Sequence, residues 1–478
     1  MSNDELQSDE KNCYKPFLII SIAGLLIYAQ AILFPFSNYD DYSFIVMNSH
    51  IHEISFENLK TLWVPGLYEG EPIYNPLSYT VLMFLYAIGS GDPLPFHLFN
   101  VLLHIGSACI LFKILLSLKV DHKVALIVSL FFIAHPVQSE AVAWAFGLKD
   151  LLAAILALSA FYYYLNDRKN RCLVFYLLAC LAKPSVLLLA VFFAVYRLLK
   201  DRKFVPRDLV YLAVSVLIVI LNQIQSHVQQ SIHVVGESTV SMSTNNLSYI
   251  FMVPLAILQR LIPYMPFPRF FNRPETVSQF SMITGMVLGI ALLIILIELY
   301  RRKKNDSICG LFFFILLFCP VAAVVISNRA FYMADRYLYL PLVGLLMLIP
   351  QFLTTKGRLK AATVILCIFA AMSVYNARQW QTNESLWKSC LRHGDSTWVS
   401  YQLAQDYYQN RRFLQAVPLL EKVAKKYPNN LKARYHLADC LNKIGDNNSA
   451  ITHLKYILER DADNTQAKKL LAAIYLAQ

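Results

Sequence analysis

Long apolar runs with few charges alternate with short basic clusters along most of this chain, and they constrain its fold more than any other feature. A helix that crosses a bilayer needs about 20 mostly apolar residues. Hydrophobic residues make up 57% of the 478 positions and charged residues 15%, whereas soluble domains are nearer one half and one quarter. We predict about eleven crossings: 17–34, 95–118, 124–140, 150–165, 172–182, 186–199, 209–224, 281–300, 309–327, 338–353 and 361–376.

The basic clusters predict an orientation, because cytoplasmic loops are enriched in Lys and Arg. If the N-terminal tail 1–16 is cytoplasmic, the strong clusters between predicted spans also fall on that side. They are Lys119 and Lys123, Arg168 to Arg171, Lys200 to Arg207, Arg301 to Lys304, and Lys356 to Lys360. The net charge of +12 is therefore explained by loops flanking membrane helices and does not indicate a nucleic-acid partner.

Two further apolar segments, 74–89 and 246–265, would invert this orientation if they crossed. We assign them to helices that lie along the outer face of the membrane. The first outer loop then covers 35–94, and the membrane domain covers 17–376. The run from Phe17 to Phe34 has no small-residue cleavage site after it and is predicted to be an uncleaved anchor.

The segment 377–478 is charged, favours helices and repeats with a period of 34 residues. Units that begin at Thr397 and Leu431 align Leu403 with Leu437 and Ala404 with Ala438. This period is typical of tetratricopeptide repeats, which are stacked helix pairs. We predict an α-solenoid of about two repeats with caps, placed on the outer side and used for binding.

Ionisable residues gather in the predicted outer loops, where a charge at the membrane boundary indicates a functional site. The candidates are Asp40 and Asp41 after the first span, His135 and Glu140 after the third, Lys149, Lys183 after the fifth, and Arg329, Asp335 and Arg336 after the ninth. A carboxylate can accept a proton from an attacking hydroxyl, and Lys or Arg can stabilise a departing phosphate. Sugar transfer from a lipid-linked donor fits this combination.

Structural interpretations of the same residues remain open. The two aspartates are equally explained as solvated loop charges, and Lys183 as a cation that extends to the interface. Asp335 is equally explained by an ion pair with Arg336 or Arg329. A divalent metal at the acidic pair is an alternative that we do not favour, and we expect no metal and no other cofactor.

The motifs "NYDD", "PFHLFNVLLH", "AHPVQSEAVAW", "LAKPS" and "MADRYLYLPLVGL", followed by the repeats, resemble the bacterial relatives of the transmembrane-and-tetratricopeptide O-mannosyltransferases. That family belongs to the GT-C glycosyltransferase superfamily. The resemblance implies a multi-span all-α bundle of GT-C type, a polyprenyl-phosphate sugar donor, inverting chemistry, and repeats that face the periplasm or lumen. It also implies an acidic pair at Asp40 and Asp41, a second acid at Glu140, and cations at Lys183 and Arg336.

The chain departs from the bacterial pattern at "GLKD", where Lys149 lacks the usual preceding arginine. The predicted function is transfer of a sugar to an acceptor hydroxyl, such as Ser or Thr of a protein, at the outer face of a bacterial inner membrane. The expected partners are the lipid-linked donor, membrane lipids, and an acceptor protein or glycan engaged by the repeats.

A non-enzymatic scaffold that recruits partners through its repeats is the alternative function. A transporter would instead place its charges within the membrane, in the middle of helices. The residues do not identify the sugar.

Overall fold

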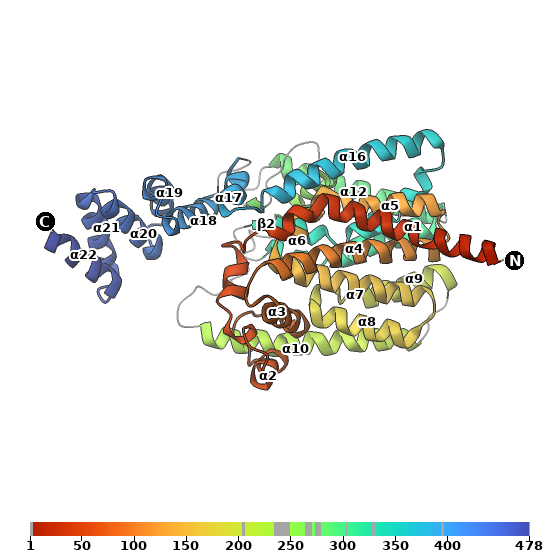
Figure 1. The fold of residues 1–478 in the computed structure, drawn as a ribbon, viewed down its shortest axis with the longest axis horizontal. Coiled ribbons are helices and arrows are strands. Elements are labelled where there is room, and N and C mark those ends of the chain that lie inside the picture. The colour runs from red at the N-terminus through yellow and green to blue at the C-terminus, as the bar shows by residue number, and fades with distance from the viewer. Residues whose placement is uncertain are drawn as a thin grey trace. The chain divides into compact units, whose positions relative to one another are not determined.

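The computed structural model describes residues 3–202, 206–233, 249–262, 270–272, 279–302, 304–326, 331–392 and 396–477. Two compact units divide the chain, Met1–Gln381 and Thr382–Gln478, and each is built from helices (Figure 1). The all-α class predicted from the sequence is confirmed. Within the described residues the only sheet is a short antiparallel pair, β1 (Phe270–Asn272) with β2 (Phe331–Ala334).

The first unit contains sixteen of the α-helices that the structure describes. They are α1 (Asn3–Tyr28), α2 (Phe56–Trp63), α3 (Pro76–Gly89), α4 (Leu94–Ser117), α5 (His122–Ala134), α6 (Ser139–Ala143), α7 (Leu148–Leu165), α8 (Lys169–Ala182), α9 (Leu189–Asp201), α10 (Leu209–His233), α11 (Val253–Leu261), α12 (Gln279–Arg301), α13 (Asn305–Phe318), α14 (Val321–Ile326), α15 (Leu342–Leu346) and α16 (Lys356–Arg378).

Six helices among the described residues are long and apolar enough to cross a membrane. They are Tyr14–Leu33, Leu94–Ser117, Ala145–Leu165, Leu209–His227, Gln279–Arg301 and Lys356–Arg378. A seventh candidate is α5 with the segment Pro136–Ala143, which bends by 48° at His135. This chain is therefore an integral membrane protein with several spans.

The remaining predicted spans form shorter helices, and the number eleven stays a prediction. The 14 residues of α8 measure about 21 Å, less than the roughly 30 Å of a hydrocarbon core. Pro184 and Pro320 follow α8 and α13, and proline ends a helix because it lacks an N–H group. Apolar length in the sequence did not reveal these breaks.

Helices α4 and α7 pack together in the core, between α1 and α5 on one side and α8 on the other. Small residues permit the close approach. A Cβ added at Gly106 of α4 would lie 2.7 Å from a side-chain carbon of Ile155 in α7. A Cβ added at Gly310 of α13 would lie 2.6 Å from the backbone oxygen of Gly344 in α15. Packing through small residues is typical of helix pairs in membranes.

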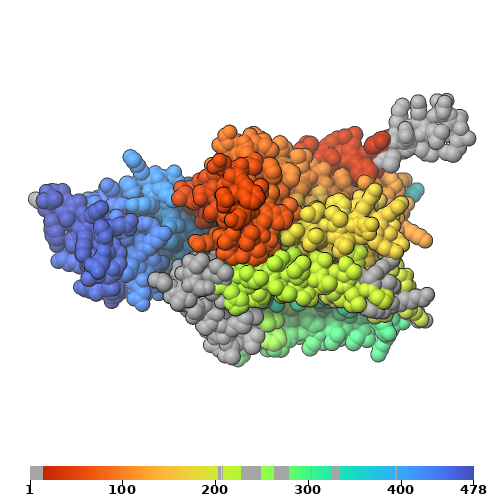
Figure 2. All heavy atoms as spheres, turned by 90° about the horizontal axis from the view of Figure 1, so that it is seen from below, coloured from red at the N-terminus to blue at the C-terminus, as the bar shows by residue number. Residues whose placement is uncertain are grey.

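The loop between α1 and α4 lies beside the C-terminal half of α10 (Figure 2). The Gln225 amide donates to the backbone oxygens of Tyr68 (2.6 Å) and Glu71 (2.9 Å). Its own oxygen accepts from the Gly66 amide at 2.7 Å. Three residues earlier, Asn222 accepts from the Tyr74 amide at 3.0 Å. One helical face of α10 therefore fixes the part of the loop that precedes α3.

The second unit is a stack of helix pairs, which confirms the predicted solenoid. Its helices are α17 (Asn383–Leu391), α18 (Thr397–Gln409), α19 (Phe413–Lys426), α20 (Leu431–Lys443), α21 (Asn447–Arg460) and α22 (Thr465–Ala477). The two predicted repeats begin at the first residues of α18 and α20, and Leu403, Leu437, Ala404 and Ala438 are all buried. The repeat domain was predicted from 377, whereas α16 runs to Arg378 and the second unit begins at Thr382.

Candidate functional site

Arg197–Asp208 is one of five buried acid–cation pairs in the described part of the first unit, and the other four are linked to one another through residues that are consecutive in the chain. These four are Glu140–Arg336, Asp150–Lys183, Glu71–Lys149 and Asp335–Arg260. Each of these eight side chains is less than one fifth exposed. Lys149 and Asp150 are consecutive in the chain, so the pairs that contain them are adjacent. Asp335 and Arg336 are also consecutive and link the other two pairs. An unpaired buried charge would cost several kcal/mol, so the pairing explains how these groups can be buried together.

Asp41 is buried and binds backbone groups from two loops. Its Oδ2 accepts hydrogen bonds from the Ser37 amide and the Ser37 hydroxyl, both at 2.9 Å. Its Oδ1 accepts from the Phe146 amide at 2.8 Å. Burial raises the pKa of the Asp41 carboxyl to about 7, and these three hydrogen bonds oppose the shift only in part. Asp41 therefore connects the loop after α1 to the turn before α7.

Asp40 differs from Asp41 because the two residues occupy successive positions of one helical turn, which continues into a π-helix over Tyr42–Val46. Successive helical residues point about 100° apart. Asp41 is 1% exposed, whereas Asp40 is only partly buried. Of the two carboxylates, Asp40 is the one that a molecule outside the core can reach.

Glu140 and Arg336 form the most buried pair. The Arg336 guanidinium donates to Glu140 Oε1, and the Asp335 amide donates to Glu140 Oε2 at 2.8 Å. Glu140 is 0% exposed. The guanidinium carbon lies 5.0 Å from the centre of the Trp144 ring, a distance that suits a cation–π contact. The predicted cost of an isolated Glu140 charge is thus offset by Arg336 and by backbone donors.

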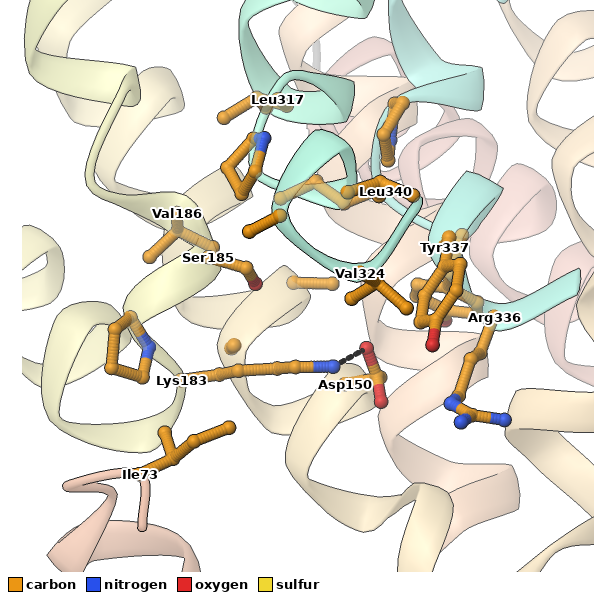
Figure 3. Close-up of a pocket in the computed structure, with 18 of the residues that line it drawn as sticks. Ile73, Asp150, Lys183, Ser185, Val186, Leu317, Val324, Arg336, Tyr337 and Leu340 are labelled. Carbon is orange, nitrogen blue, oxygen red and sulfur yellow. Dashed lines mark hydrogen bonds and ion pairs between the residues drawn. The ribbon is translucent and has the colours of Figure 1, made fainter. Parts of the chain in front are cut away.

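A cavity of about 430 Å³ lies between α7, the α8–α9 connection, α14 and the segment 336–341. Lys183 extends along one edge to form an ion pair with Asp150, and the guanidinium of Arg336 lies at the same edge (Figure 3). Val186, Leu317 and Leu340 form the opposite, apolar wall. The cavity therefore presents two cations at one end of an apolar space.

Lys149 precedes Asp150 in α7 and pairs with an acid that was not predicted from the sequence. Its ammonium donates to Glu71 Oε1 at 2.7 Å and lies 4.0 Å from the centre of the Phe146 ring. Glu71 also accepts from the Tyr79 hydroxyl at 2.8 Å. Burial acts to raise the pKa of Glu71, but Lys149 and the hydrogen-bond donors outweigh it and lower the pKa. The only feature of the sequence that marks Glu71 is its position before a proline in the first loop, in "EGEP".

Asp335 forms an ion pair with Arg260 of α11 at 3.0 Å. The sequence offered Arg336 and Arg329 as partners. Arg336 pairs with Glu140 instead, and Arg329 lies outside the described residues.

His135 is separate from the cavity that holds Lys183 and Arg336. Its Nδ1 accepts from the Val137 amide at 3.2 Å, which caps a turn of 3-10 helix, and its ring contacts Phe369 of α16. His135 lines a different cavity, between α5 and α16. The structure thus brings Lys149, Lys183 and Arg336 into one acid–cation cluster and leaves His135 outside it.

The described residues contain no group of three or more His, Cys, Asp or Glu side chains arranged to hold a metal ion. The charged side chains of the site are suited to acid–base and electrostatic chemistry. A reachable carboxylate can take a proton, and two cations beside an apolar cavity can bind an anion with an apolar tail.

Comparison with known proteins supports the resemblance for part of the chain. Residues 407–474 match the tetratricopeptide repeat family. The chain is 31% identical over 138 residues to the human protein named protein O-mannosyl-transferase TMTC3, a match that covers 27% of this chain and 15% of that protein. The mouse protein of the same name is 29% identical over 138 residues, with the same coverage. The resemblance to the transmembrane-and-tetratricopeptide O-mannosyltransferases is thus confirmed, over about 15% of the relatives' length.

Among solved structures, the oligosaccharyltransferase of Archaeoglobus fulgidus in its apo form is similar with a TM-score of 0.41 and 12% identity. The match covers 83% of this chain and 58% of that one.

Proposed function

We propose that this chain is a membrane glycosyltransferase of GT-C type that moves a sugar from a polyprenyl-phosphate donor to an acceptor hydroxyl, with inversion. The observation that carries the proposal is the cavity lined by Lys183, Arg336 and Asp150 at one edge and by apolar side chains elsewhere. A polyprenyl-phosphate sugar likewise combines a charged phosphate with an apolar chain, so its two parts match the charged edge and the apolar walls of the cavity. The phosphate would lie between Lys183 and Arg336, where low exposure strengthens charge-assisted hydrogen bonds.

Asp40 is the general base in this mechanism. It accepts the proton of the acceptor hydroxyl while the hydroxyl oxygen forms a bond to the anomeric carbon of the sugar. The bond between that carbon and the phosphate oxygen breaks, and the electron pair leaves with the polyprenyl phosphate. Attack opposite the leaving group inverts the anomeric centre. Lys183 and Arg336 stabilise the charge that develops on the phosphate, so no general acid is required.

Asp41, Glu140 and Glu71 act as positioning residues in this proposal. Asp41 fixes the turn that carries Asp40 through its bonds to Ser37 and Phe146. Glu140 holds the guanidinium of Arg336 by a direct ion pair. Asp40 is proposed as the base because it is the more exposed carboxylate of the acidic pair.

The acceptor is proposed to be a Ser or Thr hydroxyl of a protein. The curated relatives are named protein O-mannosyl-transferases, and tetratricopeptide repeats commonly bind other proteins through their stacked helices. We place the reaction and the repeats on the outer side of the membrane, because the basic clusters are predicted to be cytoplasmic. The membrane is proposed to be a bacterial inner membrane because the motifs resemble those of the bacterial relatives. A non-enzymatic scaffold is the alternative, and it gives no role to a cavity with two buried cations.

The deciding experiment uses the purified full-length chain in nanodiscs with a set of polyprenyl-phosphate sugars. We expect one of them to be retained by the wild type and consumed when an acceptor peptide is added, with glycopeptide detected by mass spectrometry. Asp40→Asn should retain the donor without forming product, and Asp92→Asn is a matched control on an exposed loop carboxylate. Failure of the wild type to retain any polyprenyl-phosphate sugar would favour the scaffold.

A further inference from the structure

A second cavity, of about 710 Å³, lies between α5, α15, the turn Ile349–Phe352 and α16. It shares no lining residue with the cavity around Lys183. Its walls are apolar, formed by leucine, isoleucine, phenylalanine and alanine side chains, apart from His135 and Arg358. Both α5 and α16 belong to candidate membrane spans. The groove therefore lies along a membrane-crossing helix, where lipid chains are the surrounding solvent.

The length of the groove matches one leaflet. Along α16 it extends from Arg358 to Phe369, eleven residues apart, which corresponds to about 16 Å of helix. Half of a hydrocarbon core measures about 15 Å. A single acyl chain in the groove would end near His135 and Phe369, with its head group at Arg358.

Charge at the Arg358 end is positive. Lys356 and Arg358 are both exposed, and the sequence has no Asp or Glu between Arg336 and Glu384. Through Nη1, Arg358 donates to two neutral oxygens, the Phe352 carbonyl at 3.3 Å and the Thr354 hydroxyl at 3.4 Å. A guanidinium has five N–H donors, so most remain for an anion. The first turn of α16 thus complements a phosphate that carries a net negative charge.

We propose that this groove is a binding site for one anionic phospholipid of the adjacent leaflet. An acyl chain lies against Leu345, Leu346 and Ile365, and the phosphate binds Arg358. The lipid fills the space between α16 and the helices α5 and α15. Near its other end, α16 contacts α5 and α6, the helix that carries Glu140. There the Ser373 hydroxyl donates to the Ala134 carbonyl at 2.8 Å, and the Ser139 hydroxyl donates to the Ser373 carbonyl at 3.3 Å. The proposal depends on the membrane location alone and not on glycosyl transfer.

The test is native mass spectrometry of the delipidated full-length protein titrated with phosphatidylglycerol or phosphatidylethanolamine of the same chain length. We expect one phosphatidylglycerol to be retained at least tenfold more tightly, and Arg358→Ala to lower that retention by about tenfold because a charge-assisted contact is lost. Lys360→Ala is the matched control: it removes a positive charge from the same end of α16 but does not line the groove, and its retention should stay near wild type.

A second variant tests the chain-binding part. Ala361 is exposed and lines the groove, so Ala361→Trp should fill it without disturbing the core and should reduce retention of both phospholipids. Thermal unfolding in detergent should agree, with phosphatidylglycerol raising the midpoint of wild type and Lys360→Ala more than that of Arg358→Ala and Ala361→Trp. Equal retention of the two phospholipids by wild type, or equal effects of Arg358→Ala and Lys360→Ala, would overturn the proposal. Displacement of the phospholipid by stoichiometric polyprenyl phosphate would also overturn it, because the groove would then hold a donor chain.

Discussion

The Phe146 amide donates a hydrogen bond of 2.8 Å to Asp41, across 105 positions of the sequence. Phe146 lies in the turn just before α7. Lys149 and Asp150, in the first turn of α7, contribute to two of the buried ion pairs. A carboxylate in the first loop therefore sets the position of the helix end that carries two charged members of the site. Asp41 therefore has a structural role in this arrangement.

Asp40→Asn is expected to lower the turnover of glycosyl transfer by roughly 10² to 10⁴, because the acceptor proton loses its base. Retention of the donor and the thermal midpoint should stay close to wild type, since Asp40 is only partly buried. Single-turnover assays with saturating donor measure the chemical step directly. Unchanged turnover in Asp40→Asn would remove this residue from the mechanism and restore its interpretation as a loop charge.

Asp41→Ala is expected to lower the free energy of unfolding by about 1–3 kcal/mol for each backbone donor left unsatisfied. The affected donors are the amides of Ser37 and Phe146. Chemical or thermal unfolding in detergent measures the loss, and Asp40→Ala provides the matched comparison at the adjacent position. A larger loss in Asp40→Ala than in Asp41→Ala would contradict the structural role assigned to Asp41.

The raised pKa of Asp41 predicts how stability changes with pH. Its carboxyl has a pKa of about 7 in the folded chain against 3.8 for an unperturbed aspartate. The folded state therefore binds more protons than the unfolded state between these values, and stability falls as pH rises from about 4 to about 7. The difference in unfolding midpoint between wild type and Asp41→Asn should shrink or reverse across this window and stay constant above it. A difference that grows with pH would show that the pKa of Asp41 is lowered.

The long membrane helices and the repeats of this fold could be predicted from the sequence, but the breaks in the shorter helices and the partners within the site could not. Apolar runs and the 34-residue period depend on local sequence, so the membrane helices and the repeats were found. Ion pairs join residues that are far apart in the chain: Glu71 and Lys149 are separated by 78 positions. No local pattern indicates such a pair, which is why Glu71 was missed. The sequence also left the roles of Asp40 and Asp41 open. The two residues are adjacent in the chain, and the helical turn that they form is what buries one side chain and leaves the other partly exposed.

The pair Glu140–Arg336 predicts strong coupling between two substitutions. Arg336→Met alone leaves a fully buried carboxylate without its cation and should destabilise the protein by about 3–5 kcal/mol. Glu140→Gln alone should cost less, because the guanidinium keeps the Trp144 and Tyr39 rings as neighbours. The double variant should recover part of the loss, and a double-mutant cycle by unfolding measures the coupling. Additive losses would mean that the two side chains do not interact as the structure has them.

Exposure of the repeat unit to the outer side is a prediction of the basic clusters. Cys440 is buried, so a thiol reagent needs an introduced site, and Lys432→Cys on the exposed surface of α20 provides one. The exposed Cys319 and Cys367 are first replaced by Ser. An impermeant maleimide should label Lys432→Cys in intact spheroplasts, and should label Lys123→Cys only after the membrane is opened. Labelling of the two sites in the reverse order would invert the topology.

Lys183 is expected to contribute to donor binding in both the ground state and the transition state, because the phosphate is charged in both. Its ammonium lies at the cavity edge with Asp150 as partner, so Lys183→Ala also leaves that carboxylate without its cation. The double variant Lys183→Ala/Asp150→Asn removes the charge pair together and separates the two effects. We expect retention of the polyprenyl-phosphate sugar to fall by at least tenfold in Lys183→Ala and in the double variant. Donor retention at the wild-type level in the double variant, with transfer intact, would make Lys183 a structural partner of Asp150 and place the lipid phosphate elsewhere.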